Sequence, residues 1–255
     1  MKVMKHADIL KYRYGLDKII AVAPYGSMNY NLFEENVSDV DTKAIYCPTL
    51  EDVLFSPPIS KAISIGNGEF CDLKDIRTMI QMWKKQNINF LEILFSDYLW
   101  INPKYKNIFS TYFLKIKESI ANFDTRYTYH SIIGQGLTHL KKCHKTYSGK
   151  IYANSIRMLM YLEKLQQGKT FKERIVLSNN ERKQLLTIKH SINFPSSGEY
   201  VYERIKTRFK ELQEYASEQS KKWETEEKEE QKRISYIMEQ GVKELFFENL
   251  KGRII

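Results

Sequence analysis

The sequence predicts an α+β fold, in which a small domain with a mixed sheet, residues 1–120, is followed by an all-helical domain, residues 121–255. Two observations support this fold class. Short apolar, β-prone runs end at about residue 103, and only helical patterns follow them. The charge balance changes in the same region: residues 1–100 contain 11 Lys and Arg against 13 Asp and Glu, whereas the rest contains 29 against 18.

Four strands are predicted in the first domain, at residues 18–23, 40–46, 59–65 and 69–72. Pro24 and Pro48 follow the first two strands closely. The sequence Gly66-Asn67-Gly68 separates the last two and is typical of a hairpin turn. A polar loop or short helix, residues 27–38, is expected between the first two strands.

Helices account for the rest of the predicted structure. Their ranges are residues 75–86, 89–95, 104–119, 127–145, 149–167 and 179–190. Ser178 and Glu181 form a capping-box pattern at the start of the last of these helices, and Gly168 ends the one before it. Residues 199–248 are rich in Lys, Glu and Gln and form either one long helix or two.

Composition and segment lengths exclude several classes of protein. Charged residues make up 28% of the chain, which is typical of a globular rather than a disordered protein. No apolar run reaches the roughly 18 residues of a membrane helix, and residues 1–10 lack the apolar core of a secretory signal. The three cysteines have no CxxC spacing, so reduced thiols are expected. A cytoplasmic protein without a membrane partner is therefore expected, and no pattern indicates its oligomeric state.

Three features close together in the first domain indicate chemistry. Gly26-Ser27 follows the first predicted strand, Asp39 and Asp41 lie at the start of the second, and a third acid, Asp72 or Glu69, lies on the fourth. Side chains two apart on a strand point to the same side, so the Asp pair presents two carboxylates on one face. Two like charges this close favour a bound cation, and hard oxygen ligands suit Mg²⁺. A third carboxylate on a neighbouring strand completes a two-metal site for in-line displacement at phosphorus.

The Gly-Ser turn complements these acids. Backbone N–H groups and a hydroxyl at the start of a helix can bind triphosphate oxygens. Taken one at a time, the same residues are better explained as a helix cap or a surface turn. Their combination in this order is much more specific and predicts a phosphoryl-transfer site.

The third acid has two candidates. Asp72 and Glu69 are three residues apart and point to opposite faces of a strand, so only one of them can serve. Asp72 is alternatively the cap of the helix that follows. Asp75 is expected in the first turn of that helix, where its charge interacts favourably with the helix dipole.

The whole pattern resembles the core motif of the DNA polymerase β-like nucleotidyltransferase superfamily. The resemblance is carried by Tyr25-Gly-Ser-Met-Asn-Tyr-Asn, by Ser38-Asp-Val-Asp-Thr-Lys43 and by residues 72–77 and 87–92. These segments also resemble predicted nucleotidyltransferases of phages and Firmicutes and, more distantly, the family associated with RNA repair. The resemblance implies an enzyme that transfers a nucleoside monophosphate from an NTP to a hydroxyl acceptor and releases pyrophosphate.

The resemblance also implies roles for individual residues. Gly26 and Ser27 would hold the β- and γ-phosphates of the NTP. Asp39, Asp41 and Asp72 would be the catalytic carboxylates and the ligands of two Mg²⁺ ions, or of Mn²⁺ in their place. Asp72 would in addition help to deprotonate the attacking hydroxyl.

Four more residues are assigned to the nucleotide. Lys150 and Arg157 are seven apart on a predicted helix, so they lie on nearly the same face and can reach a triphosphate. A solvated basic face explains these two residues equally well. Asn29 and Tyr30 are expected to line the same pocket.

The acceptor is predicted from charge. The basic second domain suggests RNA or another polyanion as a partner, although Lys and Arg that merely solvate long helices explain the same charge. A protein or a small molecule is an alternative acceptor, as in an antitoxin-like or defence protein that adds nucleotides to another protein. A further hypothesis, from a different class, is a nucleic-acid-binding protein with a degenerate nucleotidyltransferase core.

Overall fold

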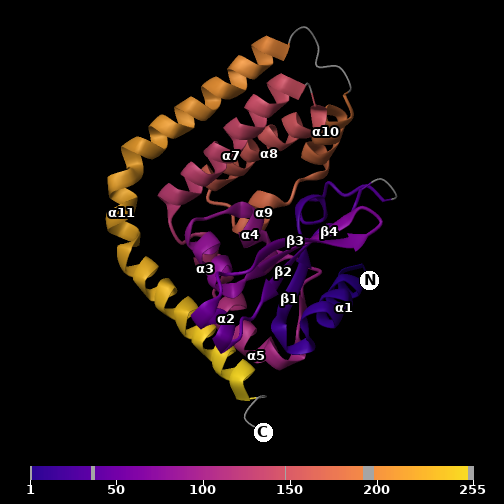
Figure 1. Ribbon diagram of the computed structural model, residues 1–255. Coiled ribbons are helices and arrows are strands. Elements are labelled where there is room, and N and C mark those ends of the chain that lie inside the picture. The colour runs from indigo at the N-terminus through magenta and orange to yellow at the C-terminus, as the bar shows by residue number, and fades with distance from the viewer. Residues whose placement is uncertain (1, 36–37, 147, 192–197, 252–255) are drawn as a thin grey trace.

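The structure, a computed structural model, describes residues 2–35, 38–146, 148–191 and 198–251. It confirms the α+β class, because a five-stranded mixed sheet forms in the N-terminal half and helices follow it (Figure 1). The strands are β1 (Ile19–Pro24), β2 (Thr42–Tyr46), β3 (Ser60–Gly66), β4 (Glu69–Asp75) and β5 (Trp100–Ile101). Their order across the sheet is β3-β4-β2-β1-β5.

Strand pairing places the starts of β2 and β4 side by side. These two strands are parallel, with Lys43 opposite Asp72, whereas β1–β2, β3–β4 and β1–β5 are antiparallel. The predicted β3–β4 hairpin is confirmed. Strand β4 is longer than predicted and continues to Asp75, because β2 pairs with it as far as Tyr46. Strand β5 was not predicted, since two residues are too few to show an alternation.

Helix α1 (Lys2–Tyr14), which was not predicted, packs on one face of the sheet. Val3, Ala7 and Leu10 recur at helical spacing, and all three are buried in one cluster with Val22 of β1 and Leu73 of β4. Helix α1 therefore covers one face of the sheet.

Short helices lie between the strands and lead from the sheet to the helical half. They are α2 (Leu50–Phe55), α3 (Ile76–Lys84), α4 (Ile88–Leu91), α5 (Lys106–Phe109) and α6 (Lys117–Ala121), with the 3₁₀ turns η1 (Leu16–Lys18), η2 (Gly26–Met28), η3 (Glu92–Phe95) and η4 (Pro103–Tyr105) and the π-helical η5 (Ser110–Leu114). The prediction of one continuous helix at residues 104–119 was wrong. A π turn changes the side-chain spacing there, and Phe109 and Phe113, with ring centroids 5.2 Å apart, are both buried.

The described residues of the C-terminal half form the helices α7 (Thr125–Thr146), α8 (Gly149–Gln166), α9 (Phe171–Ile175), α10 (Asn179–His190) and α11 (Gly198–Lys251). The capping box at Ser178 is confirmed. Residues 199–248 belong to one helix, α11, which runs along the outside of the molecule and ends beside the sheet (Figure 1). Helices α7 and α11 approach closely at Gly136, where an added Cβ would lie 2.1 Å from Cζ of Phe209.

One hydrophobic cluster joins the two halves. It extends from Ile20 of β1 to Leu245 of α11, and α11 packs against α7, η5 and α3. The division of the chain at residue 120 stays a prediction. None of the described helices joins sufficient length to the apolar composition that a bilayer crossing requires.

Candidate functional site

The turn after β1 is tight. Gly26 has a φ of +79°, in the left-handed region that favours glycine. Its carbonyl accepts the Asn29 N–H at 2.9 Å, and the Ser27 carbonyl accepts the Leu32 N–H at 2.9 Å. A loop or short helix was expected at residues 27–38, and among its described residues, 27–35 and 38, the helical part is the single turn η2. The Ser27 hydroxyl makes no hydrogen bond with a described residue, so it is available to a ligand.

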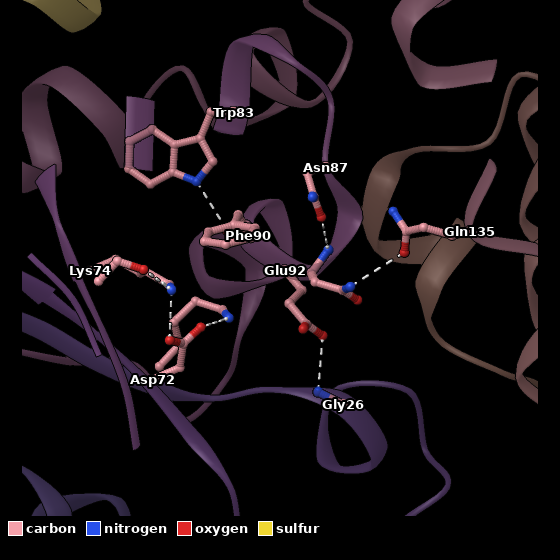
Figure 2. A network of polar contacts seen from close by, with 11 residues as sticks. Gly26, Asp72, Lys74, Trp83, Asn87, Phe90, Glu92 and Gln135 are labelled. Carbon is pink, nitrogen blue, oxygen red and sulfur yellow. Dashed lines mark hydrogen bonds and ion pairs between the residues drawn. The ribbon is translucent and has the colours of Figure 1, made fainter. Parts of the chain in front are cut away.

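A buried acid, Glu92, lies behind this turn (Figure 2). Its Oε2 accepts the Gly26 N–H at 3.2 Å and the side-chain amide of Asn29 at 3.3 Å. The same amide donates to the Pro24 carbonyl at 2.8 Å, which ties it to the end of β1. Glu92 was not predicted as a site residue. The available signal was an acid inside the otherwise apolar stretch at residues 89–95.

Burial dominates the electrostatics of Glu92. The side chain is 0% exposed. Burial raises the pKa of Glu92 to about 7, against the opposing effects of Tyr30, Arg157 and the Gly26 N–H. Its Oε1 accepts no hydrogen bond of normal geometry from a described residue, although Tyr30 is close enough to lower the pKa. Glu92 therefore changes its charge near neutral pH.

Tyr30 and Arg157 connect the turn to the helical half. The Arg157 guanidinium lies over the Tyr30 ring, with Cζ 3.7 Å from the ring centroid. The Arg157 side chain is buried, and its Nε has no hydrogen-bond partner among the described residues. The Leu177 N–H donates to the Tyr30 carbonyl at 3.2 Å. Lys150, on the same helix α8 as Arg157, is instead exposed and makes no ion pair with a described residue.

The Asp pair lies just before β2 rather than within it. Strand pairing begins at Thr42 and not at Val40 as predicted. Asp39 is exposed and makes no hydrogen bond or ion pair with a described residue. Asp41 is half-buried, and its Oδ1 accepts the Phe70 N–H of β4 at 3.0 Å. Asp41 is thus attached to the neighbouring strand, whereas Asp39 is free to reorient.

Asp72 of β4 points to the same side of the sheet as Lys43 of β2. Its Oδ2 is 2.9 Å from Nζ of Lys43, and its Oδ1 is 2.9 Å from Nζ of Lys74 (Figure 2). The Lys43 ammonium is nearly buried and lies 4.5 Å from the ring centroid of Tyr25 and 4.3 Å from that of Phe90. Lys43 was not predicted as a site residue, although its position two residues after the Asp pair was a signal.

Glu69 and Asp72 lie on opposite faces of β4. Glu69 faces α1, where its Oε2 is 3.1 Å from Nε2 of the buried His6. Nδ1 of His6 is in turn 2.8 Å from the Thr42 hydroxyl. Of the two acids, only Asp72 shares the side of the sheet that carries Lys43.

Asp75, and not Asp72, caps helix α3. Its Oδ1 accepts the Arg77 N–H at 2.8 Å, which is the bond expected of an N-cap residue. The expectation of Asp75 in the first turn of the helix was therefore wrong by one position. Asp72 is left without a capping role.

Three carboxylates act electrostatically on Tyr25. Burial, followed by Asp41, Asp72 and Glu92, raises the pKa of the Tyr25 hydroxyl to about 12. The described residues contain no group of three His, Cys, Asp or Glu side chains close enough together to hold a metal ion. A metal ion at this site would need substrate oxygens in addition to the acids, a mode of binding that suits Mg²⁺.

The family model of RlaP, the RNA repair pathway DNA polymerase beta family, matches residues 16–239, a range that includes the turn, the acids and helix α8. The chain belongs to the RlaP family. Membership confirms the resemblance to DNA polymerase β-like nucleotidyltransferases. It supports nucleotidyltransferase activity for the family as a whole. No curated protein matches the chain.

Proposed function

We propose that the protein transfers a nucleoside monophosphate from an NTP to a hydroxyl acceptor and releases pyrophosphate. The observation that carries the proposal is the position of Asp41 between the Gly26-Ser27 turn and the strand of Asp72. The Asp41 carbonyl accepts the Tyr25 N–H at 3.2 Å, and the Asp41 side chain accepts the Phe70 N–H of β4 at 3.0 Å. Acids that can hold a cation, next to donors that can hold phosphate oxygens, are the parts that nucleotidyl transfer needs. Membership of the RlaP family supports the same reaction class.

The triphosphate would bind through the turn. Ser27 offers a hydroxyl that no described residue occupies. Lys150 is exposed and is proposed as a further phosphate contact from α8. Asn29 and Tyr30 would act by holding the turn, because the Asn29 amide is already bound to Glu92.

Asp39 and Asp41 would hold Mg²⁺, or Mn²⁺ in its place, together with phosphate oxygens. Carboxylate oxygens are suitable donors, and Asp39 has no competing partner among the described residues. The bound cations would supply positive charge against the charge that develops on the phosphates. Asp72 is proposed as the third ligand, which requires Lys43 or Lys74 to release one of its oxygens.

The proposed reaction is an in-line displacement at the α-phosphorus. The acceptor oxygen bonds to the α-phosphorus, and the bond from that phosphorus to the α–β bridging oxygen breaks. Pyrophosphate leaves with the electron pair of the broken bond. Asp72 is the proposed acceptor of the hydroxyl proton, which then passes to solvent.

RNA is the proposed acceptor. The family is named for an RNA repair pathway, and the chain carries an excess of Lys and Arg after residue 100. If a protein or a small molecule is the acceptor instead, incubation with NTPs labelled at the α-phosphate should give a labelled product that resists ribonuclease.

A nucleic-acid-binding protein with a degenerate core is the second candidate. The pairing of both Asp72 oxygens with lysines favours it, because a metal ion needs unpaired carboxylate oxygens. This candidate predicts strongly salt-dependent RNA binding. It also predicts that NTP binding, if present, does not depend on Mg²⁺.

Thermal unfolding in the presence of Mg²⁺ and each of the four NTPs separates the two candidates. The enzyme should gain stability from at least one NTP only when Mg²⁺ is present. Asp41→Asn should lose this gain. Asp8→Asn is a matched control, because Asp8 is an exposed acid on α1 that pairs with Lys11. A gain that is absent in wild type, or unchanged in Asp41→Asn, would count against the enzyme.

A further inference from the structure

Glu92 has no part in the proposed reaction, yet it is fully buried directly behind the Gly26-Ser27 turn. We propose that Glu92 is a positioning residue, which fixes this turn through the Gly26 N–H and couples it to helix α8 through Tyr30 and Arg157. The effect on the nucleotide rests on the proposed function. The coupling between the turn and α8 is independent of it.

The Gly26 N–H points to Glu92 Oε2 at 3.2 Å, so this donor is not open to a phosphate oxygen. The sequence-based role of Gly26 as a phosphate donor is thereby replaced by a role in the shape of the turn. An added Cβ at Gly26 would meet nothing within 4 Å, so glycine is required there for its φ of +79° and not for space. Glu92 holds the N–H side of that conformation.

The turn is also linked to the helical half of the chain. Arg157 of α8 stacks on Tyr30 at 3.7 Å, and both residues act on the charge of Glu92. The Asn31 side-chain amide donates to the Leu177 carbonyl at 3.2 Å, and the Leu177 N–H donates to the Tyr30 carbonyl. The segment that leaves the turn is therefore bound to the helical half by side chains and backbone. A displacement of α8 would be transmitted to the turn.

The acceptor of the hydrogen bonds from Gly26 and Asn29 is a carboxylate rather than a neutral amide. A neutral amide oxygen could accept from Gly26 and Asn29 at a lower desolvation cost. A carboxylate also attracts Arg157, whose buried Nε has no hydrogen-bond partner among the described residues. The pKa of Glu92 is lowered by Tyr30, Arg157, Gly26 and Asn29. Glu92 in turn raises the pKa of Tyr25. The hydrogen bonds thus serve the turn, and the charge serves the link to α8.

The Gly26 amide reports the coupling without any nucleotide. In the full chain labelled with ¹⁵N-glycine, the Gly26 resonance should follow the ionisation of Glu92, with a midpoint at about pH 7. Glu92→Gln should abolish this titration. Arg157→Gln should raise the midpoint by about half a pH unit or more, because Arg157 lowers the pKa of Glu92.

A matched control and two negative outcomes complete this experiment. Glu227 is another partly buried acid with a raised pKa, but it binds Thr125 at the start of α7. Glu227→Gln should leave the Gly26 titration unchanged. A Gly26 resonance that does not titrate in wild type, or that has the same midpoint in Arg157→Gln, would overturn the coupling.

Nucleotide affinity tests the positioning of the turn. The probe is Mg²⁺ with the α,β-methylene analogue of whichever NTP stabilises the wild type most. Glu92→Gln keeps an acceptor for Gly26 and should bind within about threefold of wild type, whereas Glu92→Ala should bind at least about tenfold more weakly. Equal affinity of Glu92→Ala and wild type would overturn the positioning role. If wild type binds no nucleotide while Gly26 titrates with Glu92, the proposed function fails and the coupling stands.

Discussion

Replacing Glu92 by glutamine is expected to remove one pH-dependent contribution to the stability of the protein. In the folded chain, burial raises the pKa of Glu92 to about 7 from its ordinary value of 4.5. A group whose pKa is higher in the folded than in the unfolded state contributes stability that is fully present below the unfolded pKa. That contribution is lost as the pH rises through the folded pKa. The contribution of Glu92 to the free energy of unfolding therefore falls between about pH 4.5 and pH 8.

The magnitude follows from the two pKa values. The interval from 4.5 to about 7 corresponds to about 3 kcal/mol of free energy of unfolding. Glutamine cannot ionise. The difference in free energy of unfolding, Glu92→Gln minus wild type, should therefore rise by about 3 kcal/mol between pH 4.5 and pH 8.

Urea unfolding followed by tryptophan fluorescence at several pH values measures this difference. The two proteins share every other titratable group, so the change in the difference isolates Glu92. A difference that stays constant across the pH range would show that Glu92 titrates as it does in the unfolded chain. That result would refute the argument from burial.

Three other substitutions have expected outcomes. Lys43→Met removes a nearly buried charge from Asp72 and should lower the free energy of unfolding in urea by about 2 kcal/mol; no loss would contradict a stabilising ion pair. Gly136→Ala places a Cβ 2.1 Å from Cζ of Phe209 and should lower Tm by an amount equivalent to about 1–3 kcal/mol. An unchanged Tm would mean that α7 and α11 separate easily. Ser178→Ala removes the capping box of α10 and should cost about 1 kcal/mol in thermal unfolding, and Ser178→Asp should recover most of it.

Local patterns in the sequence were sufficient to predict four strands and most helices. The β3–β4 hairpin and the capping box at Ser178 each depend on residues a few positions apart, and both are confirmed. The prediction of a single helix at residues 104–119 failed because 3₁₀, α and π turns follow one another there. Tyr105, Phe109 and Phe113 are all buried and four residues apart, so their helical spacing did not reveal the changes of turn type.

The candidate site was predictable only where its residues are close in sequence. Gly26-Ser27 and the Asp pair form a compact motif, but Glu92 reaches the turn from 66 residues away. Arg157 reaches Tyr30 from another helix altogether. Contacts of this range are set by the tertiary fold, so no spacing in the sequence reveals them.

The choice between two candidate acids needed the same kind of information. Their spacing showed that Asp72 and Glu69 face opposite sides of a strand. It could not show that α1 would cover the side of Glu69 with His6. The contact of Glu69 with His6 of α1 supports Asp72 as the proposed third acid.

Transfer of a labelled nucleotide to RNA would show whether Asp41 and the turn beside it perform nucleotidyl transfer. The full chain is incubated with Mg²⁺, RNA that ends in a 3′-hydroxyl, and NTPs radiolabelled at the α-phosphate. Wild type and Asp8→Asn should transfer label to the RNA and release pyrophosphate. Asp41→Asn, with an unchanged unfolding temperature, should be slower by on the order of 100-fold. Equal rates for wild type and Asp41→Asn would show that Asp41 has no catalytic role.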